Sequence, residues 1–274
     1  MNRAAILGLG LMGGSLARAL LAEGRRVAGW APDAVDRHAA AAAGVEVAPS
    51  AAEAVVGAEV VVLASPIGAV GPLLRELAPR LSPDAVVTDV ASLQVPVLDA
   101  ADAVGLGART VTAHPLAGGE RSGFSAGSAE LYRGAPLFLS ARDGVDPARR
   151  DAVERFWGAT GARIEWIDAV AHDARMSRVS HLPQVVSTAL ADTLARGGVA
   201  LEDLGPGGRD TTRLAASSPA MWADLFAHAD PALAPSLRAV AAALIEDAEA
   251  LEAGTPAPLV ARLERAGTWR REEG

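Results

Sequence analysis

The sequence predicts an α/β fold in which an N-terminal, doubly wound parallel sheet is followed by an all-helical domain. In the first half, short apolar, β-branched runs alternate with helical patterns rich in alanine and leucine. A glycine-rich motif joins the first such run to the first helical pattern. After Asp168 the strand-like runs stop, and the remaining chain is helical in pattern. We therefore expect one domain over residues 1–168 and a second over 169–274.

Each element follows from its local pattern. Near-continuous apolar runs such as residues 60–63 are typical of strands that are covered on both faces. Pro183 should kink or break the longest helix, because proline lacks the backbone N–H. The predicted strands are 4–10, 26–31, 59–65, 85–90, 109–114, 136–141 and 162–167. The predicted helices are 13–23, 33–43, 50–57, 67–81, 95–104, 147–160, 169–196, 220–227, 235–253 and 258–265.

The composition excludes several kinds of chemistry. All 25 basic residues are arginine and the chain has no cysteine, so thiol nucleophiles, Schiff-base lysines and phosphate-binding Gly-Lys-Ser loops are absent. A net charge of -8 argues against a nucleic-acid or anionic-membrane partner. No uncharged run reaches the roughly 20 residues of a membrane span, and the five histidines lack metal-ligand spacing. We expect a soluble, cytoplasmic protein without a bound metal.

The glycine-rich motif indicates a Rossmann-type dinucleotide site. Gly8, Gly10 and Gly13 follow a predicted strand and open a predicted helix. The first glycine allows a tight turn, the second lets backbone approach a pyrophosphate, and the third lets the helix pack on the strand. The helix N-terminus then binds the phosphates. The predicted cofactor residues are Gly8, Gly10, Leu11, Met12, Gly13, Asp33, Ser65 and Pro66.

The choice between NAD and NADP stays open in the sequence. An acidic residue usually ends the second strand of NAD-binding domains, but here the position is Ala31. Asp33 either reaches the ribose or merely caps the following helix. Arg37 would contact a phosphate if the loop bends toward it.

Polar residues follow two neighbouring strands at the predicted ligand crevice. Asp89 and Ser92 lie at the end of one strand, and His114 at the end of the next. An imidazole here can accept a hydroxyl proton while a hydride leaves the same carbon. The alternative is that His114 only caps a loop beside Pro115, but its site context favours catalysis.

Five segments in order resemble the prephenate/arogenate dehydrogenases of tyrosine biosynthesis. They are residues 8–15, 89–92, 114–123, 180–183 and 208–215, and the similarity extends from residue 5 to about residue 225. It implies NAD(P)-dependent oxidative decarboxylation of prephenate to 4-hydroxyphenylpyruvate, or of arogenate to tyrosine. It also implies a homodimer whose helical domain serves substrate binding and dimerisation. A nucleotide-sensing regulator without turnover is the alternative of another class.

The resemblance implies roles for individual residues. His114 would assist deprotonation of the ring hydroxyl, Ser92 would orient it, and Arg213 would bind a substrate carboxylate. The further substrate residues are Arg209, His181, Gln184, Glu120 and Trp222. The related β-hydroxyacid dehydrogenases rely on a catalytic lysine, which this chain lacks.

Three further positions carry specific expectations. His172 and Asp173 match a His-Asp pair of the family, and we expect them only to cap and orient a helix. Gln184 stands where the family usually has histidine, so the preference between prephenate and arogenate is open. Gln94 stands where the family commonly has lysine, and His38 and His228 should be surface residues.

Overall fold

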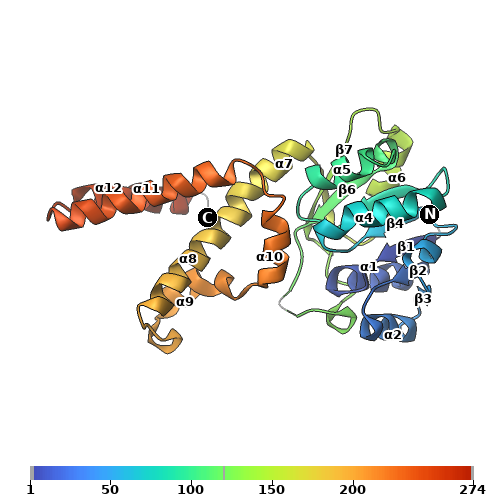
Figure 1. Ribbon diagram of the computed structural model, residues 1–274, viewed down its shortest axis with the longest axis horizontal. Helices are drawn as coiled ribbons and strands as arrows, with labels where there is room; N and C mark the ends of the chain where they lie inside the picture. Colours follow the sequence, from blue (N-terminus) through green and yellow to red (C-terminus); the bar gives the residue numbers. More distant parts are fainter. Residues whose placement is uncertain (1–2, 120, 273–274) are drawn as a thin grey trace. The chain divides into compact units, whose positions relative to one another are not determined.

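The N-terminal half forms a parallel sheet, which confirms the predicted α/β class. The computed structural model describes residues 3–119 and 121–272. Five parallel strands pair in the order β3-β2-β1-β4-β5 (Figure 1). Their bounds are β1 Arg3–Leu7, β2 Arg26–Trp30, β3 Glu46–Val47, β4 Val60–Leu63 and β5 Val86–Asp89. This order places the carboxyl ends of β1, β4 and β5 at one edge, where ligands of such sheets bind.

A second sheet continues from the first. A bridge between Val87 and Thr110 joins β5 to the chain that enters β6. The order is β6-β7-β8, with β6 antiparallel and β8 parallel to β7. The bounds are β6 Val111–Pro115, β7 Pro136–Ala141 and β8 Arg163–Trp166. The end of β6 therefore lies beside the end of β5.

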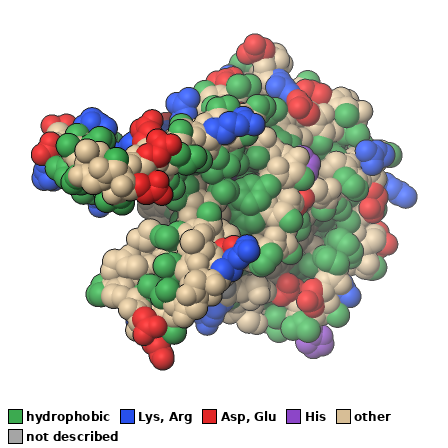
Figure 2. Space-filling view, turned by 60° about the vertical axis from the view of Figure 1, so that its left-hand side comes forward, with side chains coloured by type: hydrophobic (Ala, Val, Ile, Leu, Met, Phe, Trp, Pro, Cys, Tyr) green, Lys and Arg blue, Asp and Glu red, His purple; other side chains and the backbone are tan. Residues whose placement is uncertain are grey.

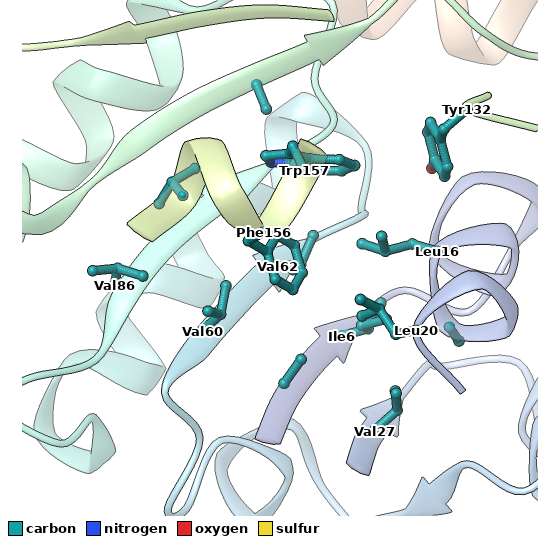
Figure 3. Close-up of a cluster of buried hydrophobic side chains, with 14 of the residues drawn as sticks. Ile6, Leu16, Leu20, Val27, Val60, Val62, Val86, Tyr132, Phe156 and Trp157 are labelled. Atoms are coloured by element: carbon teal, nitrogen blue, oxygen red, sulfur yellow. The ribbon is translucent and has the colours of Figure 1, made fainter. Parts of the chain in front are cut away.

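Helices cover both faces of the parallel sheet because the strands are almost continuously apolar and successive side chains point to opposite faces. Ile6, Val60 and Val62 pack against α1 and α6, together with Leu16 and Trp157 (Figure 3). Their neighbours Leu7, Val61 and Leu63 pack against α3, α4 and α5. The helices are α1 Leu11–Ala22, α2 Ala34–Ala42, α3 Ala51–Ala54, α4 Ile67–Leu77, α5 Val95–Asp102 and α6 Pro147–Gly158.

The rest of the chain is helical. Its α-helices are α7 Ala169–Met176, α8 Leu182–Arg196, α9 Pro206–Thr212, α10 Pro219–Phe226, α11 Leu233–Glu252 and α12 Ala257–Glu272. The chain forms two compact units: one extends to Met176 and includes Ala216–Ala229, and the other comprises Ser177–Ala215 and the chain from Asp230 onward. The change from strand to helix falls between β8 and α7, and the domain boundary at residue 168 stays a prediction.

The helix that the sequence predicts to be kinked or broken at Pro183 is interrupted immediately before this residue. Residues Ser177–His181 form a π-helical turn between α7 and α8, and Pro183 occupies the first turn of α8. A proline is tolerated there because its missing N–H needs no intrahelical partner. The single predicted helix over 169–196 is therefore two helices.

The surface combines charged and apolar side chains (Figure 2). On α11 and α12 several large apolar side chains are more than half exposed, namely Leu244, Ile245, Leu263 and Trp269. Within residues 3–119 and 121–272, no helix has the length and apolar character needed to cross a membrane.

Candidate active site

The loop between β1 and α1 has the geometry of a diphosphate site. Gly8 has a φ of 103°, and a Cβ on Gly13 would lie 1.9 Å from the Gly8 carbonyl oxygen. Neither position accepts a side chain. A Cβ on Gly10 would meet no atom within 4 Å, so open space borders the backbone there. Gly10 is the N-cap of α1 and its helix has no side-chain cap, which leaves N-terminal amides for an anion.

A pocket of about 460 Å³ lies at the carboxyl ends of β1, β4 and β5. It brings together predicted cofactor residues from the Gly10 loop and from the segment after β4, and Ser92 from the segment after β5. The hydroxyl oxygen of Ser65 is buried and has no hydrogen-bond partner among the described residues, so it can serve a ligand. The lining residues are Gly10, Leu11, Met12, Ala64, Ser65, Pro66, Ile67, Val90, Ala91, Ser92, Ala220, Met221, Asp224 and Leu225.

Two contacts fix the walls of this pocket. Both carboxylate oxygens of Asp224 accept from the Gly68 amide at 3.0 Å, which holds α10 at the N-terminus of α4. On the other side, the buried Tyr132 donates its hydroxyl proton to the Met12 carbonyl at 2.7 Å. The first turn of α1, which directly follows the nucleotide loop, is therefore anchored by a residue far along the chain.

The end of β2 contains the residues that bear on cofactor choice. Asp33 is the N-cap of α2, and its Oδ1 accepts from the Val35 amide at 2.7 Å. Its helix-capping role is therefore observed, and a contact with ribose stays a prediction. The Arg37 guanidinium donates from one nitrogen to the carbonyls of Ala31 and Pro32, at 2.6 and 2.8 Å.

His114 lies at the end of β6 and is paired with a second histidine. Its Nδ1 is 2.9 Å from Nε2 of His172, and the two rings meet edge to face. The Nδ1 atom of His172 is 2.8 Å from Oδ1 of Asp173. The prediction that His172 and Asp173 only cap and orient a helix is wrong, because Asp168 caps α7 and His172 contacts the catalytic candidate.

Asp173 is held in place by the start of α5. Its Oδ1 accepts from the backbone N–H of Gln94 at 2.8 Å, and its Oδ2 accepts from the backbone N–H of Val95 at 2.9 Å. His172 and Asp173 are both buried. Charge-assisted bonds to helix N-terminal amides stabilise a carboxylate, so Asp173 can orient the His172 ring.

These contacts select one arrangement of protons. A carboxylate at Nδ1 of His172 calls for a proton on that atom, and neutral His172 then presents a lone pair at Nε2. Nδ1 of His114 consequently carries a proton and donates it to His172. The lone pair of the His114 ring is then at Nε2, the position from which it can act as a base.

The side chain of Asp89 binds the backbone of β6 next to His114. It is fully buried, and its two oxygens accept from the amides of Ala91 and Ala113, at 2.8 and 3.1 Å. Burial raises the pKa of Asp89 to about 8, the two amide bonds oppose the rise, and the charge of Asp173 adds to it. Since Ala113 directly precedes His114 in β6, the bond from Ala113 to Asp89 fixes the backbone position of His114.

Gln94 is an interior residue. Its side chain is fully buried, donates to the Phe138 carbonyl at 3.0 Å, and accepts from the Ser140 hydroxyl. These bonds join α5 to β7 and leave Gln94 no direct role toward a ligand.

The predicted substrate residues of the helical part are placed as follows. Arg209 and Arg213 lie four residues apart, on α9 and on the 3₁₀ turn that continues it. The guanidinium of Arg209 donates to the carbonyls of Leu204 and Glu202, whereas Arg213 is exposed. The Gln184 amide donates to the Leu214 carbonyl at 2.8 Å, beside Arg213. Their contact with substrate stays a prediction.

The other predicted residues are more varied. His181 is buried at the end of the π-helical turn. Trp222 stacks on Phe226 within α10, with ring centroids 5.1 Å apart. Glu120 lies outside the described residues. His38 and His228 are exposed, and no group of three metal-binding side chains occurs in the part of the chain that the structure describes.

Comparison with known proteins shows the family to which the chain belongs. Residues 16–166 match the nucleotide-binding domain of prephenate dehydrogenase, and residues 168–265 match its dimerization domain. The cyclohexadienyl dehydrogenase of Zymomonas mobilis is 33% identical over 85% of this chain and 83% of its own length. The prephenate dehydrogenase of Bacillus subtilis is 32% identical over 81% of this chain, which spans 63% of that protein.

Solved structures give the same result. The Aquifex aeolicus prephenate dehydrogenase, crystallised with hydroxyphenyl propionate and NAD+, has a TM-score of 0.89 and 30% identity, covering 100% and 99% of the two chains. Arogenate dehydrogenase from Synechocystis has a TM-score of 0.83 and 26% identity, covering 99% and 100%. The 3-hydroxyisobutyrate dehydrogenase of Mycobacterium tuberculosis, at 19% identity and a TM-score of 0.53 over 74% and 68%, shares the fold alone. The chain belongs to the prephenate dehydrogenase family.

Proposed function

We propose that this protein converts prephenate to 4-hydroxyphenylpyruvate and carbon dioxide with a nicotinamide dinucleotide as oxidant. The observation that carries the proposal is the series of contacts from the buried Asp173 and His172 to the half-buried His114. His114 ends β6, the neighbour of β5, and the segment after β5 lines the dinucleotide-type pocket. The series supplies a base with a defined protonated nitrogen at the place where the oxidant's reactive end is expected.

The residues at the pocket fit a dinucleotide. The space beside Gly10 suits a diphosphate, and the hydroxyl of Ser65 offers a donor for which residues 3–119 and 121–272 provide no partner. When bound, the nicotinamide ring accepts a hydride from the ring carbon that bears the substrate hydroxyl.

The protein moves one proton in the reaction. Nε2 of His114 accepts the proton of the ring hydroxyl as that carbon loses its hydride, and Ser92 orients the hydroxyl. The positive charge on His114 is stabilised through His172 and Asp173. The bond to the ring carboxylate then breaks, its electrons make the ring aromatic, and carbon dioxide leaves. His114 returns the proton to the phenolate oxygen.

Binding of the substrate carboxylates is assigned to arginine. Arg213 is the anchor that we propose, since a guanidinium matches a carboxylate in two parallel hydrogen bonds. Arg209, His181, Gln184, Glu120 and Trp222 are proposed to complete the substrate site. The exposed apolar side chains of α11 and α12 and the dimerization-domain match support a homodimer, which we place in the cytoplasm.

Arogenate is the second candidate substrate. Gln184, which we place near the substrate side chain, is a neutral amide whose nitrogen donates to the Thr188 hydroxyl and the Leu214 carbonyl. Its lack of charge therefore selects neither the keto group of prephenate nor the ammonium group of arogenate.

The deciding experiment is a grid of two substrates and two cofactors. Purified protein is given prephenate or arogenate with NAD+ or NADP+, and reduced cofactor is followed. We expect reduced cofactor to form when prephenate is the substrate. Faster turnover of arogenate would make the protein an arogenate dehydrogenase, and silence in all four combinations would leave a nucleotide-binding regulator.

A further inference from the structure

The end of β2 lacks the carboxylate that NAD-binding domains use. In such domains an acidic residue at this point accepts hydrogen bonds from the ribose hydroxyls, and it would repel a 2′-phosphate. The residue that follows β2 here is Ala31, whose side chain is buried. An unmodified ribose therefore finds no acceptor at this position, and a phosphate meets no repulsion from it.

The two acidic side chains nearest in sequence are bound to backbone amides. Asp33 accepts from the Val35 amide, and Asp36 accepts from the Phe124 amide, both at 2.7 Å. Each bond directs one carboxylate oxygen to the protein itself. Asp33 and Asp36 are thus each partly engaged by the backbone, and neither stands at the strand end itself.

Arg37 lies against the end of β2, the strand end that carries the ribose-binding residue in dinucleotide-binding domains. One of its terminal nitrogens donates to the carbonyls of Ala31 and Pro32, so the guanidinium is fixed against the end of β2. The side chain is half-buried. Guanidinium has five N–H groups, and the other nitrogens still carry three of them. Throughout residues 3–119 and 121–272, no carboxylate forms an ion pair with Arg37.

From these contacts we infer that Arg37 and Ala31 form a 2′-phosphate site and that the protein prefers NADP to NAD. The inference rests on the proposed dinucleotide function of the Gly10 loop. A guanidinium fixed by two carbonyls loses little conformational freedom on binding, which favours a charge-assisted bond to phosphate. An unphosphorylated ribose has no negative charge at this position, so it cannot form a comparable bond with the Arg37 guanidinium.

Calorimetric binding tests this preference without turnover. NADPH and NADH are titrated into the purified protein, followed by 2′,5′-ADP and 5′-AMP, which differ only in the 2′-phosphate. We expect the phosphorylated member of each pair to bind about tenfold to a hundredfold more tightly, the range of a charged hydrogen bond. Equal binding, or tighter binding of NADH, overturns the inference and leaves the proposed function intact.

Three variants separate recognition from folding. Arg37→Gln should abolish the preference for 2′,5′-ADP and leave 5′-AMP affinity unchanged, and Ala31→Asp should reverse the preference. Arg155→Gln, on the exposed surface of α6, is the matched control and should retain it. If a folded Arg37→Gln protein lost affinity for 2′,5′-ADP and for 5′-AMP equally, the role of Arg37 would be structural and the inference would be overturned. Failure of the wild type to bind any of the four compounds would overturn the proposed function as well.

Discussion

Nε2 of His172 lies 2.9 Å from Nδ1 of His114, although 58 residues separate them in sequence. The contact joins the first turns of α7 to the end of β6 and is buried on the His172 side. It determines which nitrogen of His114 is protonated, and therefore from which side the ring can accept a proton. His172 is in this sense a positioning residue for the proposed base.

Removing the base should stop turnover with little effect on binding. We expect His114→Asn to lower kcat by about 100-fold or more, because general-base assistance contributes that much. Steady-state kinetics with prephenate measures the change. Dinucleotide affinity should stay at the wild-type value, and survival of turnover would exclude His114 as the base.

Two substitutions at His172 test its positioning role. The amide of His172→Asn can still reach Asp173 but is too short to reach His114, whereas the longer amide of His172→Gln can occupy the Nε2 position. We expect kcat to fall by about tenfold or more in the first variant, with partial rescue in the second. The acidic limb of the kcat/KM pH profile should move to lower pH in His172→Asn, since the imidazolium loses support. Equal activity of the two variants and an unmoved profile would mean that His172 only fills space.

Asp89 should make stability depend on pH in a specific direction. Burial raises its pKa from 3.8 to about 8, so the folded protein keeps a proton that the unfolded chain has lost between these values. The neutral carboxyl therefore contributes stability that is complete below about pH 4 and is lost as pH rises through 8. Denaturant unfolding of the wild type and Asp89→Asn should show the wild-type advantage shrinking over this range. A constant difference would show that the two amide bonds keep Asp89 ionised.

Arg213 should act on binding more than on chemistry. We expect Arg213→Ala to raise the Michaelis constant for prephenate by about tenfold to a hundredfold, as expected for a lost charged anchor. Arg238→Ala, a substitution on α11, provides a control arginine, and its constant should match the wild type. An unchanged constant in Arg213→Ala would reassign the carboxylate site.

Two glycines of the nucleotide loop should respond differently to one methyl group. Gly10→Ala adds a Cβ into open space, so unfolding should be unchanged while dinucleotide affinity falls. Gly13→Ala places the Cβ 1.9 Å from a carbonyl oxygen, and overpacking of this kind costs about 1–3 kcal/mol. Thermal unfolding and NADPH titration of both variants measure the contrast. Full affinity in Gly10→Ala would locate the diphosphate elsewhere.

The parts of the fold that depend on local patterns could be predicted from the sequence. The strand at Val60–Leu63 and the helix break before Pro183 are each determined by residues that are close together in sequence. The strand Glu46–Val47 could not be predicted, because two residues carry no periodicity and their pairing with β2 determines their conformation. The antiparallel direction of β7 is likewise a property of the pairing with β6.

The site shows the same distinction between local and distant relationships. The glycine roles of the nucleotide loop depend on a turn and a helix start, which sequence spacing encodes. The pairing of His114 with His172, and the burial of Gln94 between α5 and β7, depend on packing between distant segments. Nothing in the neighbouring residues of His172 distinguishes a helix cap from a partner of the His114 ring.

The bond from Tyr132 to the Met12 carbonyl offers a spectroscopic probe. Tyr132 is the only tyrosine of the chain, so growth on fluorotyrosine would give the protein a single fluorine resonance. The probe lies inside the core, one hydrogen bond from the first turn of α1, at the proposed dinucleotide site. Cofactor arrival could thus be followed by nuclear magnetic resonance at an atom that belongs neither to the ligand nor to the reacting groups.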